Sequence, residues 1–204
     1  MIETLISFVL ATATLAISPG PDNIFVLVQS IANGKKYGLA TVVGLMTGCI
    51  VHTTLVAFGV SEVLKRNESL FFIIKLFGAI YLLYLAYQVY RSDAKIAFST
   101  KNVQQKTTFQ LFKTGFWMNV LNPKVTIFFL AFFPQFLFSD SISNVVQFYI
   151  LGGLFILTSF IIFSSIALLA GNIASYTQKH KNAGVFFKWL QIIVFIGIAG
   201  LIIY

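Results

Sequence analysis

The sequence predicts an all-α polytopic membrane protein with six transmembrane helices, arranged as two three-helix halves with broken first and fourth helices. Three observations predict this class. Hydrophobic residues make up 58% of the chain and charged residues only 10%, whereas soluble domains average about 25% charged residues. The mean hydropathy is +0.89. Apolar runs recur at about the 20 residues that a helix needs to cross a bilayer, and proline interrupts two of them.

The six predicted spans share this length and apolar composition: Leu5–Ala32 (interrupted), Leu39–Val60, Leu70–Tyr90, Phe112–Phe136 (interrupted), Val145–Leu169 and Phe186–Tyr204. Turn signals separate several of them: Asn33-Gly34, Asn67-Glu68-Ser69 and Gly171-Asn172. The acid at Glu3, in place of a basic start, predicts that the first span is retained rather than cleaved. We therefore expect one membrane domain over residues 1–204, with half-repeats at about 1–90 and 110–204 and a basic connector at about 91–110.

Lysine and arginine predict the orientation of this domain. Ten of them lie in the loops after spans one, three and five: Lys35, Lys36, Arg91, Lys95, Lys101, Lys106, Lys113, Lys179, Lys181 and Lys188. The opposite side carries only Lys65 and Arg66. By the positive-inside rule the first side is cytoplasmic and both termini are outside. The net charge of +8 therefore reflects membrane orientation and does not indicate nucleic-acid binding.

Three spans in each half mean that the second half enters the membrane in the direction opposite to the first. Proline breaks the opening span of each half, at 18–21 and at 122–123, and small residues follow in the next span at Gly44, Gly48, Gly152 and Gly153. Related halves would form an inverted repeat. Paired interruptions of this kind predict a substrate site near the bilayer midplane, between the halves.

The first break predicts where a half-helix ends and the next begins. Pro19 disfavours the α conformation at Ser18, so the incoming helix should end near Ile17. Pro21 suits the first position of a new helix, which places Asp22 and Asn23 in its first turn. Asp22 then has two interpretations: it caps the helix dipole, or it is one of the intramembrane ionisable groups that mark transport pathways.

The second break carries the opposite charge. Asn122 is a good N-cap and Pro123 a good first helical residue, so Lys124 falls at a helix N-terminus. A cation there opposes the helix dipole and forms a positive spot that attracts an anion such as a carboxylate. Alternatively, Lys124 extends its ammonium to the interface. Asp22 and Lys124 together fit the two ends of a zwitterion, or they pair with each other.

Two further polar residues lie within spans. His52 is a proton-relay candidate or a buried, hydrogen-bonded imidazole, and Lys75 is either functional or directed to the interface. One cysteine, Cys49, and two histidines make a poor metal pathway, so we expect no metal site and no cofactor. The sequence contains neither a nucleotide-binding loop nor a catalytic motif. A gradient-driven process is therefore expected, and an enzyme is not.

Three segments carry a resemblance to a known family: S-P-G-P-D-N at 18–23, K-L-F-G-A-I-Y-L-L-Y-L-A at 75–86, and G-F-W-M-N-V-L-N-P-K at 115–124 with F-P-Q-F at 133–136. Over essentially its full length the chain resembles the amino-acid exporters that include the lysine exporter and the homoserine/threonine efflux proteins. Ala86 departs from the glycine expected in many relatives.

The resemblance implies a secondary transporter of the bacterial cytoplasmic (inner) membrane that exports amino acids or their analogues and is driven by proton motive force. It singles out residues of both breaks as the site: Pro19, Gly20, Pro21, Asp22, Asn119, Asn122, Pro123 and Lys124. The alternative is an exporter of another small solute or of a metal cation. The expected partners are a small-molecule substrate, with an amino acid as the leading candidate, and the lipid bilayer; a homo-oligomer is left open.

Overall fold

The computed structural model of the chain describes residues 1–66, 68–93, 103, 105–179 and 183–203. Within these ranges the secondary structure is helical, with no β-strand. Four continuous helical stretches are long and apolar enough to cross a membrane, and two further pairs of helices reach this length together across a bend. The predicted all-α polytopic class is confirmed, and each bent pair corresponds to a span that the sequence predicts as interrupted.

The helices follow the predicted runs closely. The bent pairs are α1 (Ile2–Ile17) with α2 (Pro21–Asn33), at 59°, and α6 (Thr108–Val120) with α7 (Pro123–Ile127), at 49°, the latter continuing through η2 (Phe128–Phe132) and η3 (Phe133–Phe136). The continuous stretches are α3 (Lys35–Leu55) with η1 (Val56–Val60) and α4 (Ser61–Arg66), then α5 (Glu68–Arg91), α8 (Asn144–Leu168) and α10 (Ala183–Ile203). Position 67 of the predicted 67–69 turn, Tyr204 and the basic positions Lys95, Lys101 and Lys181 lie outside the described residues.

Both predicted breaks occur where proline chemistry places them. The helix α1 ends at Ile17, Ser18 takes an extended ψ of 118°, and α2 begins at Pro21. At the second break Asn122 is the N-cap of α7, and its side-chain oxygen accepts a hydrogen bond from the backbone N–H of Lys124 at 3.0 Å. The predicted turn after Asn33 is also confirmed, because Gly34 has a φ of 103°, which favours glycine.

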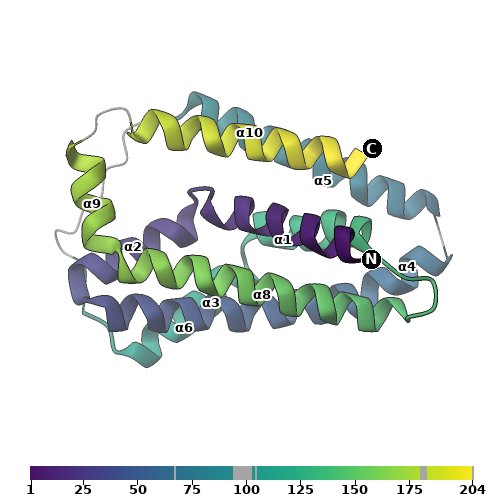
Figure 1. Cartoon of the computed structure of the whole chain (residues 1–204), viewed down its shortest axis with the longest axis horizontal. Coiled ribbons are helices and arrows are strands. Elements are labelled where there is room, and N and C mark those ends of the chain that lie inside the picture. Colours follow the sequence, from purple (N-terminus) through teal and green to yellow (C-terminus); the bar gives the residue numbers. More distant parts are fainter. Residues whose placement is uncertain (67, 94–102, 104, 180–182, 204) are drawn as a thin grey trace.

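The prediction of a turn at Gly171 and Asn172 is wrong. The helix α8 ends at Leu168 with Leu169 as its C-cap, and a new helix, α9 (Ala170–Lys179), begins directly after and contains both residues. Gly171 and Asn172 are the second and third residues of α9, directly after the point where the chain changes direction. The same residues therefore mark a sharp change of direction between two helices (Figure 1).

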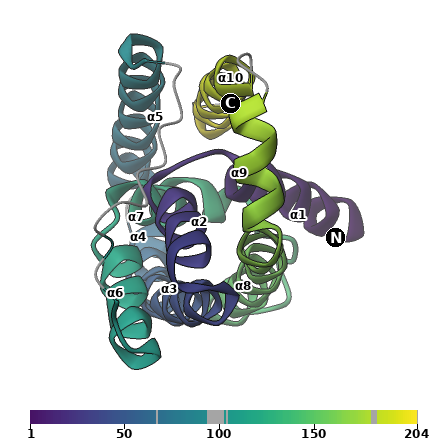
Figure 2. The same ribbon diagram turned by 90° about the vertical axis from the view of Figure 1, so that its left-hand side faces the viewer.

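The helices form three layers. Figures 1 and 2 show α5 and α10 side by side on one face and α3, α6 and α8 on the opposite face, with α1, α2 and α7 between them. Phenylalanines from α1, η2, η3, α8 and α10 join the middle layer to its neighbours, and seven of them are fully buried: Phe8, Phe128, Phe129, Phe132, Phe133, Phe148 and Phe195. At the first break Ser18, Gly20 and Asp22 are buried in protein, as unpaired backbone groups require in a bilayer.

Glycine lets α3 and α6 approach each other closely. A Cβ on Gly44 would overlap the backbone carbonyl of Phe112, and one on Gly115 would overlap the backbone carbonyl of Thr41. Gly48 faces Asn119 in the same way, at 2.8 Å. The predicted role of Gly44 and Gly48 in close helix packing is therefore confirmed. Gly152 also meets a neighbour, Thr53, whereas Gly153 has open space.

Gly44→Ala is expected to destabilise the protein by about 1–3 kcal/mol, since overpacking against rigid backbone forces α3 and α6 apart. The measurement is the apparent melting temperature of the detergent-solubilised protein. Gly59→Ala is the matched control, because Gly59 lies in the same span with nothing within 4 Å of an added Cβ. Equal melting temperatures for both variants would show that the close approach contributes nothing to stability.

Both termini lie at the same end of the bundle (Figure 1), as an even number of crossings requires. The turn at Gly34 and the helix α9 lie at the other end. The basic start of α3, at Lys35 and Lys36, is therefore at the end opposite to the termini. This position agrees with the prediction that the side carrying the ten basic loop residues lies opposite to both termini.

Candidate functional site

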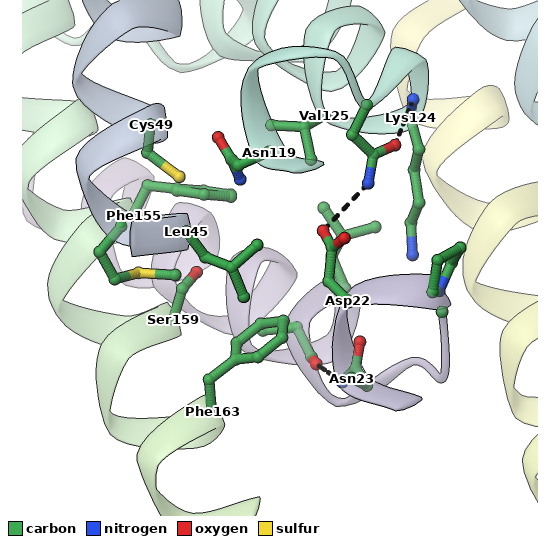
Figure 3. A pocket seen from close by; sticks show the side chains of 16 residues that line it. Asp22, Asn23, Leu45, Cys49, Asn119, Lys124, Val125, Phe155, Ser159 and Phe163 are labelled. Carbon is green, nitrogen blue, oxygen red and sulfur yellow. Dashed lines mark hydrogen bonds between the residues drawn. The ribbon is translucent and has the colours of Figure 1, made fainter. Parts of the chain in front are cut away.

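A polar cavity of about 50 Å³ lies where the two broken helices meet. It is lined by residues of α1, the α1–α2 bend, α2, α3, α6, α7 and α8: Leu15, Ala16, Gly20, Pro21, Asp22, Asn23, Leu45, Met46, Cys49, Asn119, Asn122, Lys124, Val125, Phe155, Ser159 and Phe163. A volume of this size holds a few water molecules. Both predicted breaks therefore contribute side chains to one cavity (Figure 3).

Asp22 reaches across this cavity to the other half of the chain. Its side chain is 8% exposed, and its Oδ2 accepts a hydrogen bond from Nδ2 of Asn122 at 3.0 Å. The N-cap of α2 is Gly20, and no side chain caps this helix. Asp22 is thus bonded to the second break, and it does not close the N-terminus of its own helix.

Asn122 and Asn23 hold the two bends in place. Asn122 uses its amide nitrogen for Asp22 and its amide oxygen for the backbone N–H of Lys124, so it joins α2 to the start of α7. Asn23 donates from Nδ2 to the backbone carbonyl of Ala16 at 2.7 Å. This second bond occupies a carbonyl in the last turn of α1 that the break leaves without a helical partner.

The ammonium of Lys124 lies beside the first break and does not take the hydrogen bond of Asp22. Its Nζ is 4.9 Å from the ring centroid of Phe195 on α10, which is a cation–π contact. A Cβ placed on Gly20 would lie 3.6 Å from the same nitrogen. The side chain therefore stays among the helices at the uncapped N-terminus of α2, instead of extending to the interface.

Asn119 completes the polar part of the wall. It lies in the last turn of α6 and is 3% exposed. Its backbone carbonyl is hydrogen-bonded to Nε2 of His52 at 3.0 Å, while its side-chain Oδ1 has no partner. Figure 3 shows the Asn119 side chain at the cavity edge next to Cys49.

Comparison of the sequence with known proteins identifies the family of this chain. Residues 13–204 match the family described as LysE type translocator. The chain belongs to this family. It is similar to two proteins named homoserine/homoserine lactone efflux protein, from Salmonella typhimurium and Salmonella typhi. Each is 32% identical over 176 residues, which cover 86% of this chain and 84% of the relative. No solved structure gives a significant match.

In this translocator most of the predicted site residues lie together. Seven of them line the cavity: Gly20, Pro21, Asp22, Asn23, Asn119, Asn122 and Lys124. Pro19 lines a neighbouring cavity instead, and Pro123 is the first residue of α7 without lining either. His52 contacts the cavity only through Asn119, and Lys75 lies half-buried on α5 away from it.

The apolar wall of the translocator cavity and the hydroxyl of Ser159 are not among the predicted residues. Ser159 lies inside a long apolar run, and the sequence alone does not distinguish it from Ser164 or Ser165. Its rotation toward the cavity follows from the packing of α8 against α3. Helix periodicity alone predicts the spacing of a face and not which neighbour that face meets.

A second, larger cavity of about 400 Å³ adjoins the first and shares Asn23 with it. Its walls come from the α1–α2 break, α2, α8, α9 and α10 and are almost wholly aliphatic. Its two hydroxyl groups, on Ser165 and Thr177, are bonded to carbonyls of their own helices. A zwitterion would find few partners here, so the smaller polar cavity is the candidate site.

Among the described residues, no group of three or more His, Cys, Asp or Glu side chains is placed to hold a metal ion. The polar cavity contains one carboxylate, one thiol and an ammonium, on Asp22, Cys49 and Lys124. The ammonium would repel a cation in the same small space. The geometry therefore favours an organic substrate over a metal cation.

Proposed function

We propose that this translocator exports amino acids across the bacterial inner membrane, with homoserine and its lactone as the leading substrates. The observation that carries the proposal is that Asp22 and Lys124 line one cavity without a hydrogen bond to each other. The names of the two Salmonella relatives support the choice of homoserine. A zwitterionic amino acid matches one buried carboxylate and one buried ammonium.

Each end of the substrate has a partner at the cavity, which must widen to hold an amino acid because about 50 Å³ is room for only a few water molecules. The substrate ammonium binds Asp22, whose present partner is a neutral amide. The substrate carboxylate binds between Lys124 Nζ and the N-terminus of α2, which lacks a side-chain cap. The start of α7 is the positive spot that the sequence predicts for a carboxylate, but the backbone N–H of Lys124 there already donates to the side-chain oxygen of Asn122. The start of α2 is therefore the better anion site.

Proton motive force drives export in this proposal, with Asp22 carrying the coupling proton. A carboxylate inside a span is expensive to bury and commonly marks a proton or substrate pathway. Asp22 is 8% exposed and faces both the cavity and the second half of the chain. Asp22 would bind the substrate and the proton in alternation, and this would couple the proton gradient to export of the substrate.

The two halves are proposed to form an inverted repeat that rocks around this cavity. The packing supports this: α5 lies against α10, and α3 lies against α8. In addition, α3 contacts α6 while α8 contacts α1, so the second helix of each half meets the broken helix of the other. In a structure determined in a lipid nanodisc, residues 1–90 should superpose on 110–204 by rotation about an axis in the membrane plane. A superposition about the membrane normal would reject the repeat.

Export is tested by loading cells, with and without the protein, with a panel of labelled amino acids. Faster loss of homoserine or its lactone from the expressing cells is the expected result. Dissipating the proton gradient should remove the difference between the two cell lines. Equal loss of every amino acid in both lines would reject the proposed function.

The orientation of the translocator is tested by cysteine labelling in a Cys49→Ala background. Lys36→Cys should react only with reagents that enter the cytoplasm, and Asp140→Cys should react with impermeant reagents outside. Both residues are exposed, and the start of α3 and the loop before α8 lie at opposite ends of the bundle (Figure 1). The reason is the bias of lysine and arginine toward the cytoplasmic side. The reverse pattern would place both termini inside.

A further inference from the structure

The polar cavity has two chemically different walls. The groups proposed to bind the zwitterion come from the α1–α2 bend, α2 and α7. The facing wall comes from α3 and α8 and is formed by Leu45, Met46, Phe155, Phe163 and Ser159. Figure 3 shows Ser159 among these apolar side chains, across the cavity from Asp22. Among the described residues that line the cavity, Ser159 supplies the one hydroxyl group.

The hydroxyl of Ser159 is buried and unpaired. Its residue is 2% exposed, and its Oγ has no hydrogen-bond partner. Other hydroxyls in the spans bond the carbonyl four residues earlier, as Ser30, Thr53 and Ser165 do at 2.8 Å. This bond to the preceding helical turn gives the hydroxyl of a serine in an apolar helix a hydrogen-bond partner. Ser159 lacks this bond, so its donor and acceptor capacity is left for the cavity.

Unpaired buried oxygens are also found elsewhere in the described part of the chain, on Thr12, Ser18, Ser61 and Ser164. None of these four residues lines the polar cavity. The two that do are Ser159 and Asn119, whose Oδ1 is likewise unpaired. A buried polar group without a partner is costly, and both groups lie where a bound substrate could supply the missing hydrogen bond.

We infer that Ser159 is a specificity-determining residue that hydrogen-bonds the polar end of the substrate side chain. The inference rests on the proposed function, which anchors the amino-acid zwitterion at Asp22 and Lys124. A side chain that extends from this anchor meets an apolar wall in which Ser159 offers a hydrogen bond and no residue offers a charge. The site therefore selects a short, neutral side chain that carries a hydroxyl or carbonyl oxygen, and it rejects charged side chains.

The test compares export of L-homoserine with export of L-2-aminobutyrate, which has the same carbon chain without the hydroxyl. The wild-type protein should export homoserine faster. Ser159→Ala should lower homoserine export about fivefold to tenfold, the effect of one lost hydrogen bond, and leave 2-aminobutyrate export unchanged. Continued export of 2-aminobutyrate shows that the variant is folded.

Ser164→Ala is the matched control, because Ser164 is an unpaired serine on the same helix that does not line the cavity. Ser164→Ala should keep the wild-type preference for homoserine over 2-aminobutyrate. If Ser159→Ala keeps it too, or lowers the export of both compounds equally, the inference is wrong while the proposed function stands. The same holds if Ser164→Ala loses the preference. If the wild-type protein exports neither compound nor any other amino acid, the proposed function fails and the inference fails with it.

Discussion

Asp22→Asn is expected to reduce amino-acid export at least about 30-fold while the protein remains folded in the membrane. Asparagine keeps the shape of the side chain and an oxygen that can accept the hydrogen bond from Nδ2 of Asn122. It removes the charge that would bind the substrate ammonium and the group that would carry the proton. Loss of one partner of a buried, hydrogen-bonded charge pair costs about 2–5 kcal/mol, and each 1.4 kcal/mol is a factor of about ten.

The measurement is export of labelled homoserine at several external pH values. For a proton-coupled exporter, a more acidic exterior increases the inward proton gradient and speeds export by the wild-type protein. Any residual export by Asp22→Asn should lack this dependence. Asp140→Asn serves as the control, because Asp140 is exposed in the loop before α8 and far from the cavity lining. Wild-type rates and pH dependence in Asp22→Asn would show that Asp22 is only part of the scaffold.

Lys124→Gln is expected to reduce homoserine export about 100-fold and to affect the lactone much less. Homoserine carries a carboxylate that needs a counter-charge in a buried site, and an unpaired buried charge costs several kcal/mol, with 2–5 kcal/mol a typical order of magnitude. The lactone keeps the amine but has no carboxylate. The variant should therefore change the ratio of the two export rates rather than remove both.

Both compounds are measured in the same cells, so the lactone reports whether the variant is folded. Lys188→Gln is the matched control: Lys188 also lies on an aromatic ring, that of Tyr90 at 5.7 Å, but outside the cavity. Its ratio of export rates should equal that of the wild type. An unchanged ratio in Lys124→Gln would exclude Lys124 from carboxylate binding.

Local chemistry was enough to predict the spans and their breaks. The length of an apolar run determines whether a helix can cross the bilayer, and the fixed φ of proline determines where a half-helix begins. Accordingly, α2 begins at Pro21 and α7 at Pro123, as the sequence predicts. Seven of the predicted site residues also meet in one cavity. The backbone groups left unpaired at each break cannot face lipid, and placing the two breaks against each other keeps these groups away from it.

The sequence by itself determined the membrane class, the apolar runs and the positions of both breaks, because these depend on neighbouring residues. The tertiary structure decided which groups meet: Asp22 with Asn122, one hundred positions away, and Lys124 with Phe195 of α10. It also turned Ser159 into the cavity wall. The physical reason is that helix rotation and separation follow from packing, as at Gly44 and Phe112. A one-dimensional pattern shows that a helix has a face, and only its packed neighbours determine what that face binds.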